Sequence, residues 1–330
     1  MAVSINDIKK LREMTGAGLG DCKKALAETD GNMEAAMEII RKKGQAVAAK
    51  RSDRSAAEGC VLAKAENGFG AIIALKCETD FVAKNADFVA LAQAILDAAV
   101  ANKCKSLDEV LALPMGNTTI AGAVTDRSGI TGEKMELDGY NWLEGENIST
   151  YNHQNKNFLC TMVQLNKDNA EVGHELTLKV AETAPVALDE AAVPQEVKDT
   201  ELKVAIEKTK EEQVRKAVEA ALKKAGINPA HVDSEDHMES NMGKGWITAE
   251  DVAKAKEIIA TVSAEKAANL PEQMIQNIAK GRMAKFFKES CLVSQEVEVG
   301  DQKMTVAEYL KSVDKELAVV GFKRFTLRAE

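Results

Sequence analysis

The sequence predicts an α+β protein with a three-helix N-terminal module, a core of two subdomains in which helices pack on antiparallel sheets, and a protruding helical arm. Apolar residues recur at helical spacing through residues 5–40. A strand, turn, strand and helix order then occurs twice, and a long charged helix with one apolar stripe follows. The expected segments are the module and linker at 1–54, the first core subdomain at 55–142, part of the second at 143–200, the arm at 201–286 and the return to the second subdomain at 287–330.

The N-terminal module is predicted from three apolar runs separated by turn and cap residues. The runs are Ile5, Ile8, Leu11 and Met14, then Leu19, Cys22, Ala25 and Leu26, and then Met33, Ala36, Met37 and Ile40. So few large apolar side chains make a marginal bundle, so we expect the module to lean on a partner.

A glycine-rich stretch, Gly16 to Asp21, joins the first two runs. A phosphate-binding loop is one interpretation, but an amphipathic helix precedes the stretch and Asp21 stands where the third glycine belongs. A tight turn between helices is therefore favoured, and it leaves Leu19 near a helix start where it can contact a partner.

Charge is unevenly distributed along the chain, whose net charge is -9. Residues 1–54 hold 11 basic and 8 acidic side chains, and the remainder holds 32 basic and 44 acidic ones. Nucleic-acid binders carry clustered Lys and Arg, so we expect no direct nucleic-acid contact. Residues 44–58 mix small residues with Lys50, Arg51 and Arg54, which is typical of a linker or loosely packed helix with a solvated basic face.

The core is predicted from the repeat. Residues 60–100 contain a strand, a hairpin turn at Asn67 and Gly68, a second strand and a helix, and residues 149–185 repeat this order with a polar turn from Gln154 to Asn157. We expect the sheet faces to be formed by Val61, Ile72, Ala74, Phe158, Cys160 and Met162, with helices packed on them through Phe88, Leu91, Ile95 and Leu178.

The halves differ where the second strand leads into the helix. The second half has an ordinary polar loop at residues 166–168, whereas the first has the sequence ETDFV at residues 78–82. One interpretation folds Phe81 back onto the core, with Thr79 or Asp80 capping the next helix. The other makes Phe81 an aromatic wedge on a rigid corner, presented to a pocket of another protein.

The arm is predicted from a long helix and two shorter ones. The long helix has a polar gap at Thr209 and Lys210 within an apolar side formed by Leu202, Ile206, Val214, Val218, Leu222 and Ala225. Thr248 and Asp251 form a capping box for the second helix, and Pro271 opens the third. An antiparallel coiled-coil hairpin and an ordinary helical bundle both remain open. A strand, a helix and a strand then return to the second subdomain.

Several classes of protein and site are disfavoured. Six cysteines without a C-x-x-C pair suit reduced packing residues better than zinc or redox chemistry. With no apolar leader and no apolar run of about 18 residues, we expect a cytoplasmic protein without a membrane span. Four histidines and no readable nucleophile arrangement argue against an enzyme, a metal or a cofactor. His231 and His237 could form a surface metal site, but a solvated acidic turn is favoured.

Five stretches resemble bacterial translation elongation factor Ts, the guanine-nucleotide exchange factor for elongation factor Tu. They are LREMTGAGLGDCKKALAETDGNMEAAMEIIRKKG, CETDFVAKNADF, STYNH, AKGRMAKFF and VVGFKRF, and the resemblance covers nearly the whole chain. It implies a three-helix module like ubiquitin-associated domains, a two-subdomain core and a protruding coiled coil.

The resemblance also implies a site. The turn formed by Thr79, Asp80, Phe81 and Val82 would press between helices of the Tu nucleotide domain and disturb its magnesium and phosphate contacts. Leu11, Leu19, Gly20 and Cys22 of the module, and His153, would make secondary contacts with Tu. Nucleotide release needs only a partner that binds the nucleotide-free state better, so GDP leaves and GTP can reload without a chemical step.

Other possibilities stay open at this point. A binding module unrelated to translation, in which the three helices grip a ubiquitin-like or helical partner, would leave Phe81 dispensable. The arm is longer than in the best-known members, with residues 207–247 lacking a counterpart, and the end of the chain soon after FKRF leads us to expect no C-terminal helix. A homodimer or a 2:2 complex with Tu is also open.

Overall fold

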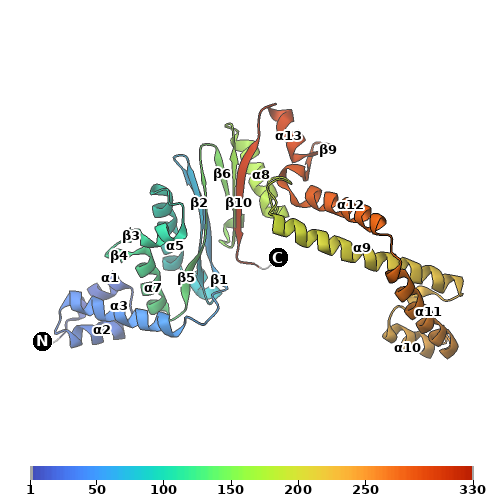
Figure 1. Ribbon diagram of the computed structural model, residues 1–330. Helices are drawn as coiled ribbons and strands as arrows, with labels where there is room; N and C mark the ends of the chain where they lie inside the picture. The colour runs from blue at the N-terminus through green and yellow to red at the C-terminus, as the bar shows by residue number, and fades with distance from the viewer. Residues whose placement is uncertain (1–2, 329–330) are drawn as a thin grey trace. The chain divides into compact units, whose positions relative to one another are not determined.

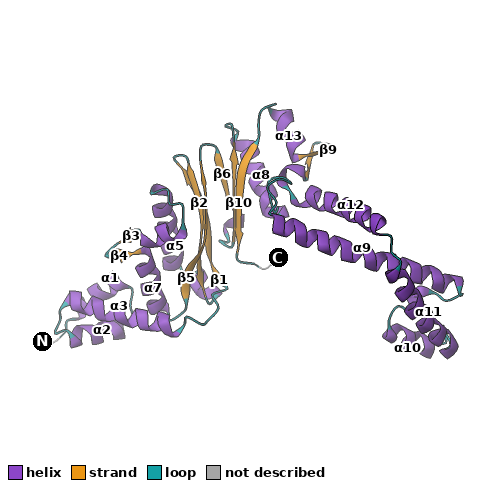
Figure 2. Ribbon diagram, viewed as in Figure 1, coloured by secondary structure: helices purple, strands orange, loops and turns teal. Residues whose placement is uncertain are grey.

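The computed structural model describes residues 3–328 and has an α+β fold, as predicted (Figures 1 and 2). Two compact units make up the chain: Met1–Pro185 with Glu296–Glu330, and Val186–Gln295. Within residues 3–328, every helix is too short or too polar to cross a membrane.

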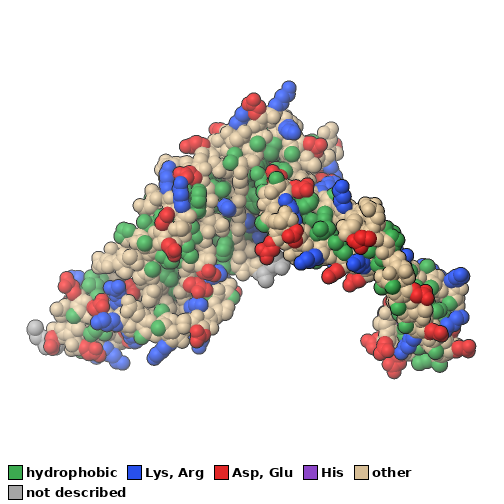
Figure 3. All heavy atoms as spheres, viewed as in Figure 1, with side chains coloured by type: hydrophobic (Ala, Val, Ile, Leu, Met, Phe, Trp, Pro, Cys, Tyr) green, Lys and Arg blue, Asp and Glu red, His purple; other side chains and the backbone are tan. Residues whose placement is uncertain are grey.

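Three helices form the head of the first unit: α1 (Ile5–Thr15), α2 (Leu19–Glu28) and α3 (Met33–Lys50). The predicted tight turn is confirmed, because Gly16 ends α1 in the left-handed conformation with φ 69°. Their shared core is small and consists of Leu11, Ala17, Cys22, Ala25, Leu26 and Ala36. Ile5 and Met14 are exposed, so the first apolar run contributes less to this core than its spacing predicts. Figure 3 shows acidic and basic side chains interspersed on the visible face of the head.

The first sheet is antiparallel in the order β1-β2-β5, formed by β1 (Glu58–Glu66), β2 (Phe69–Cys77) and β5 (Met135–Glu144). The predicted hairpin is confirmed, with φ of 51° at Asn67 and 72° at Gly68. Four helices and a small hairpin connect β2 to β5: α4 (Asp80–Ala83), α5 (Ala86–Ala101), α6 (Leu107–Ala112), the hairpin β3 (Pro114–Met115) and β4 (Thr118–Thr119), and α7 (Ile120–Thr131).

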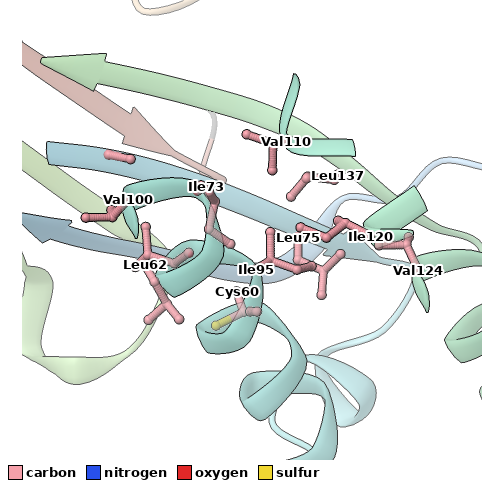
Figure 4. Packing of buried hydrophobic residues seen from close by; sticks show 14 of the residues in the cluster. Cys60, Leu62, Ile73, Leu75, Ile95, Val100, Val110, Ile120, Val124 and Leu137 are labelled. Carbon is pink, nitrogen blue, oxygen red and sulfur yellow. The ribbon is translucent and has the colours of Figure 1, made fainter. Parts of the chain in front are cut away.

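A large apolar core lies between one face of this sheet and its helices (Figure 4). Ile73 and Leu75 of β2 pack here with Phe88 and Ile95 of α5 and with Ile120 of α7. Phe88 and Ile95 thus pack on the sheet from the helix side, as predicted. Their partners in β2 are Ile73 and Leu75, which alternate along the strand with the expected Ile72 and Ala74.

The second sheet is antiparallel in the order β10-β7-β6, formed by β6 (Ile148–Asn152), β7 (Leu159–Leu165) and β10 (Val319–Thr326). Helix α8 (Ala170–Thr183) covers one of its faces, where Thr161 Oγ1 of β7 donates to the Thr177 carbonyl at 2.9 Å. The first unit also contains the 3-10 helix His153–Asn155, β8 (Glu296–Val299), β9 (Gln302–Thr305) and α13 (Val306–Val313). The pairing of β10 with β7 confirms the predicted return of the chain. Leu178 is exposed, contrary to its predicted packing role.

The two sheets pack against each other, which corrects the expected faces. A second apolar cluster joins Val61, Ala63, Ile72, Ala74, Cys160 and Met162 from the two sheets. Strand β2 is therefore buried on both faces, and a strand of that kind shows no alternation from which a face can be chosen. Gly139 of β5 permits this approach, because a Cβ there would lie 2.5 Å from Cζ of Phe325 in β10.

The head is joined to the core through α3 and α7. A Cβ on Gly129 of α7 would lie 2.1 Å from Cα of Gly44 in α3, so the helix backbones touch. Gly44 is buried, and α3 continues to Lys50. The segment that follows residue 44 is thus the exposed to half-buried end of a helix as far as Lys50, in agreement with the expected loosely packed helix, and a linker only after Lys50.

The second unit is a helical hairpin with a small distal core. It contains α9 (Gln195–Lys224), α10 (Glu235–Gly243), α11 (Ala249–Ala268) and α12 (Glu272–Ser290), and α9 packs against both α11 and α12. The predicted capping box of Thr248 and Asp251 opens α11. Thr209 is buried, not part of a polar gap, since its hydroxyl donates to the Ala205 carbonyl at 2.6 Å.

Candidate partner-binding site at the β2–α4 turn

The chain turns sharply twice between the end of β2 and the start of α5. Thr79 caps the single-turn helix α4, with its Oγ1 accepting from the Val82 amide at 3.4 Å. Asn85 caps α5 by accepting from the Asp87 amide at 2.9 Å. The prediction that Thr79 or Asp80 caps the next helix is confirmed for Thr79, and the corner carries Asp80 and Phe81 at its outer edge.

Phe81 projects into solvent with 84% of its surface exposed. Its neighbours Val82 and Ala83 pack against the apolar core beneath the turn. The interpretation that folds Phe81 back onto the core is therefore wrong. Burying such a side chain is worth about 1.5–3 kcal/mol, so the free protein forgoes a stabilisation that a partner's pocket can provide.

Asp80 presents a negative charge beside Phe81. Its carboxylate accepts from Lys84 Nζ at 2.6 Å, one turn along the chain. The hydrogen bond from Lys84 holds the pKa of Asp80 below its usual range, so this carboxylate is ionised at neutral pH. The pair is exposed, and a partner can take over either charge at small cost.

A carboxylate from a distant part of the chain supports the turn from behind. Glu133, between α7 and β5, accepts from the Glu78 and Thr79 amides at 3.2 and 3.1 Å and from Thr79 Oγ1 at 2.6 Å. Its own position is set by α7, because Ser128 Oγ donates to the Glu133 carbonyl and the Glu133 amide donates to Thr131 Oγ1 at 3.3 Å. The turn is thereby attached to a helix end.

Glu78 makes the reciprocal contact. Its carboxylate accepts from the Lys134 amide at 2.6 Å, from Arg51 Nη1 at 2.9 Å and from Arg54 Nη1 at 3.1 Å. The Lys134 amide and the two guanidinium groups lower the pKa of Glu78 to about 2. Arg51 and Arg54 are thus paired with Glu78, so the expected solvated basic face fits Lys50 and Arg54, which stay exposed, better than the half-buried Arg51.

The secondary residues are of three kinds: accessible residues of the head, buried residues of the head, and His153. Leu19 is 49% exposed and Gly20 has open space around it, so both are available at the start of α2. Leu11 and Cys22 are fully buried in the head, which corrects the expectation that they contact a partner directly, because their side chains can only support the surface from beneath. His153 is half-buried, with Nδ1 3.1 Å from the Tyr151 hydroxyl and its ring edge against Phe158.

Sequence reasoning missed Glu133 altogether. The residue lies 54 positions from Thr79, and no local pattern links the two positions. The only signal was an acid followed by a lysine just before a strand, which is common on protein surfaces.

The histidines of the arm lie apart from this turn in the sequence and have other partners. His237 Nδ1 lies 2.5 Å from Asp233 Oδ1, and the His231 ring lies 5.5 Å from that of Trp246. Among residues 3–328, no three His, Cys, Asp or Glu side chains are placed to hold a metal ion.

The fold and the turn define an α+β protein that presents an aromatic side chain on a braced corner. Comparison with known proteins identifies the family: the sequence model described as Elongation factor TS matches residues 78–329. The chain belongs to the elongation factor Ts family, which confirms the resemblance seen in the sequence, and it is a translation elongation factor.

Three relatives show how far the similarity extends. Elongation factor Ts of Parabacteroides distasonis is 71% identical over 330 residues, and that of Bacteroides fragilis is 71% identical over 331 residues. Elongation factor Ts of Porphyromonas gingivalis is 43% identical over 332 residues. Each match covers 100% of both chains, so these relatives have the full length of this chain, including the arm.

Proposed function

We propose that this protein binds elongation factor Tu with GDP bound and promotes release of the GDP, so that GTP can be loaded. Asp80 and Phe81 act as a wedge against the nucleotide domain of Tu and disturb its magnesium and phosphate contacts. The observation that carries this proposal is the exposure of Phe81 on a doubly capped, braced turn in a member of the elongation factor Ts family.

The mechanism is thermodynamic linkage, with no chemical step performed by this chain. A partner that binds nucleotide-free Tu better than Tu with GDP weakens GDP binding by the same factor. Each tenfold change requires about 1.4 kcal/mol, and a buried aromatic hot spot contributes ~2–4 kcal/mol. Phe81 can thus account for one to three decades of loosening, and other contacts supply the rest.

Secondary contacts extend the interface beyond the turn. Leu19 and Gly20 are accessible on the head, whereas Leu11 and Cys22 act by supporting that surface. His153, held by Tyr151, is assigned to a contact with another domain of Tu.

The test is the rate at which purified Tu releases a fluorescent GDP analogue. The wild-type protein is expected to accelerate release, and the Phe81→Ala variant to lose at least tenfold of that acceleration. Val320→Ala is the matched control, since Val320 is also an exposed apolar residue of the first unit.

The other outcomes separate the alternatives. Acceleration that survives Phe81→Ala would keep the exchange function and remove the wedge. No acceleration by the wild type would contradict the proposal and favour the head as a binding module for a different partner.

A further inference from the structure

The turn that carries Asp80 and Phe81 cannot hold its own shape. Helix α4 has four residues, and a helix this short is unstable in water without outside support. Its geometry depends on the cap at Thr79, whose Oγ1 must accept from the Val82 amide at 3.4 Å. The cap acts together with the packing of Val82 and Ala83 on the core, so whatever orients the Thr79 hydroxyl helps to orient Phe81.

Glu133 supplies that orientation. Because the Thr79 hydroxyl donates its proton to Glu133 Oε1 at 2.6 Å, a lone pair of the hydroxyl is left to face the Val82 amide. Glu133 Oε2 accepts from the two backbone amides that precede α4, at 3.2 and 3.1 Å. One carboxylate thus fixes both the side-chain cap and the backbone entering the turn, through charge-assisted hydrogen bonds.

A second contact joins the same two segments, residues 78–79 and residues 133–134, in the opposite direction. Glu78 accepts from the Lys134 amide at 2.6 Å, next to Glu133 in the chain. Arg51, directly after α3, donates to both oxygens of Glu78 at 2.9 and 3.2 Å. The turn at residues 79–82 is therefore connected both to the segment that follows α7 and to Arg51, the C-cap residue of α3.

We propose that Glu133 is a positioning residue for nucleotide exchange, which holds the Asp80–Phe81 turn ready for insertion before Tu is met. This inference rests on the proposed function. A turn already ordered in the free protein loses less conformational freedom on binding, so more of the interface free energy remains to loosen the nucleotide.

The first test is a double-mutant cycle in the GDP-release assay, with Glu133→Gln, Phe81→Ala and the combined variant. The Gln side chain keeps the size of Glu133 but removes its charge and turns an NH₂ group toward donors. Glu133→Gln alone is expected to slow the accelerated release about tenfold. In the Phe81→Ala background the same change is expected to have a clearly smaller effect, because Asp80 is then the only part of the wedge left for Glu133 to position.

Glu144→Gln is the matched control. Glu144 lies at the far end of β5 and pairs with Lys105 at 2.5 Å, so the variant makes the same charge change away from the turn. The control is expected to exchange nucleotide like the wild type. An unchanged rate for Glu133→Gln, or an equal loss in both backgrounds, would overturn the inference, because the residue would then be dispensable or only generally structural.

A second test does not involve Tu. Hydrogen exchange of the Glu78 and Thr79 amides is expected to be about tenfold faster in Glu133→Gln, with the amides of β7 unchanged. Thr79→Val, which removes only the hydroxyl, is the second variant if Glu133→Gln folds poorly, and it is expected to speed exchange at Val82. Unchanged hydrogen exchange at the Glu78, Thr79 and Val82 amides would contradict the role of Glu133 in holding the turn, whatever the result of the GDP-release assay. Faster amide hydrogen exchange in Glu133→Gln, together with no acceleration of GDP release by the wild-type protein, would support the role of Glu133 in the turn and reject the proposed function.

Discussion

Gly129 and Gly44 bring two helices into backbone contact, at the place where the head joins the core. A Cβ on Gly129 would lie 2.1 Å from Cα of Gly44. The Gly129→Ala variant is expected to lose about 1–3 kcal/mol of unfolding free energy, because α7 and α3 must separate. Urea unfolding measures the loss. Gly20→Ala is the control, since open space surrounds Gly20, and it is expected to stabilise by up to about 1 kcal/mol.

The Glu78 carboxylate makes the stability of the first unit depend on pH. Its pKa is lowered from 4.5 to about 2 by the Lys134 amide, Arg51 and Arg54. A depressed pKa means that the stabilisation is complete above pH 4.5 and is lost as pH falls from 4.5 toward 2. Glu78→Gln is expected to cost about 2 kcal/mol at neutral pH. The unfolding free energies of wild type and variant should converge in acid, and a constant difference would contradict this assignment.

The distal core of the arm depends on Leu222. This side chain packs with Ile227, Val232, Met238, Ile247 and Ala255. Leu222→Ala is expected to cost about 2–5 kcal/mol within the second unit, because it leaves a cavity. Leu202→Ala on the same helix is the control and should cost less than half as much, since Leu202 is 37% exposed. Amide hydrogen exchange of α10 and α11 reports the local loss.

The cysteine thiols are expected to be unreactive in the folded protein. All six are free and buried, and burial raises the pKa of Cys60 and Cys77 to about 12. A thiol-specific reagent at neutral pH should react slowly with the native protein and with all six thiols after unfolding in guanidinium chloride. Val320→Cys provides an exposed thiol as the positive control. Fast reaction of several native thiols would show that these sites open readily.

Leu19 on the head tests the secondary contact. Leu19→Asp is expected to weaken binding to Tu by about tenfold, because a charge would enter an apolar contact. Ile5→Asp is the matched control, since Ile5 is a more exposed residue of the same head, outside the assigned contact. Titration of Tu with each variant gives the affinities. Equal losses would assign the effect to the charge of the head in general.

Much of the secondary structure could be predicted from the sequence because the signals are local. The Asn67–Gly68 hairpin, the capping box at Thr248 and Asp251, and the turn at Gly16 each depend on residues within a few positions. The repeated strand, turn, strand and helix order also gave the two-part core, and the quoted stretches were enough to indicate the family.

The residue proposed to face Tu could be singled out from the sequence, but its exposure could not be predicted. Phe81 stood out because the other half of the repeat has a polar loop at that place. Whether it was buried depended on which side of a four-residue helix faces the core, and Val82 and Ala83 take that side. No periodicity can be read from so few residues.

The local elements and their order can be read from the sequence, because caps, turns and apolar spacing act over short distances, and the quoted stretches indicate the family. Contacts between distant segments establish which face of β2 meets the second sheet, why Gly44 and Gly129 are small, and that Glu133 holds Thr79. These relationships join residues tens of positions apart. Their free energy comes from packing and hydrogen bonds between segments, which leave no mark in the pattern of either segment alone.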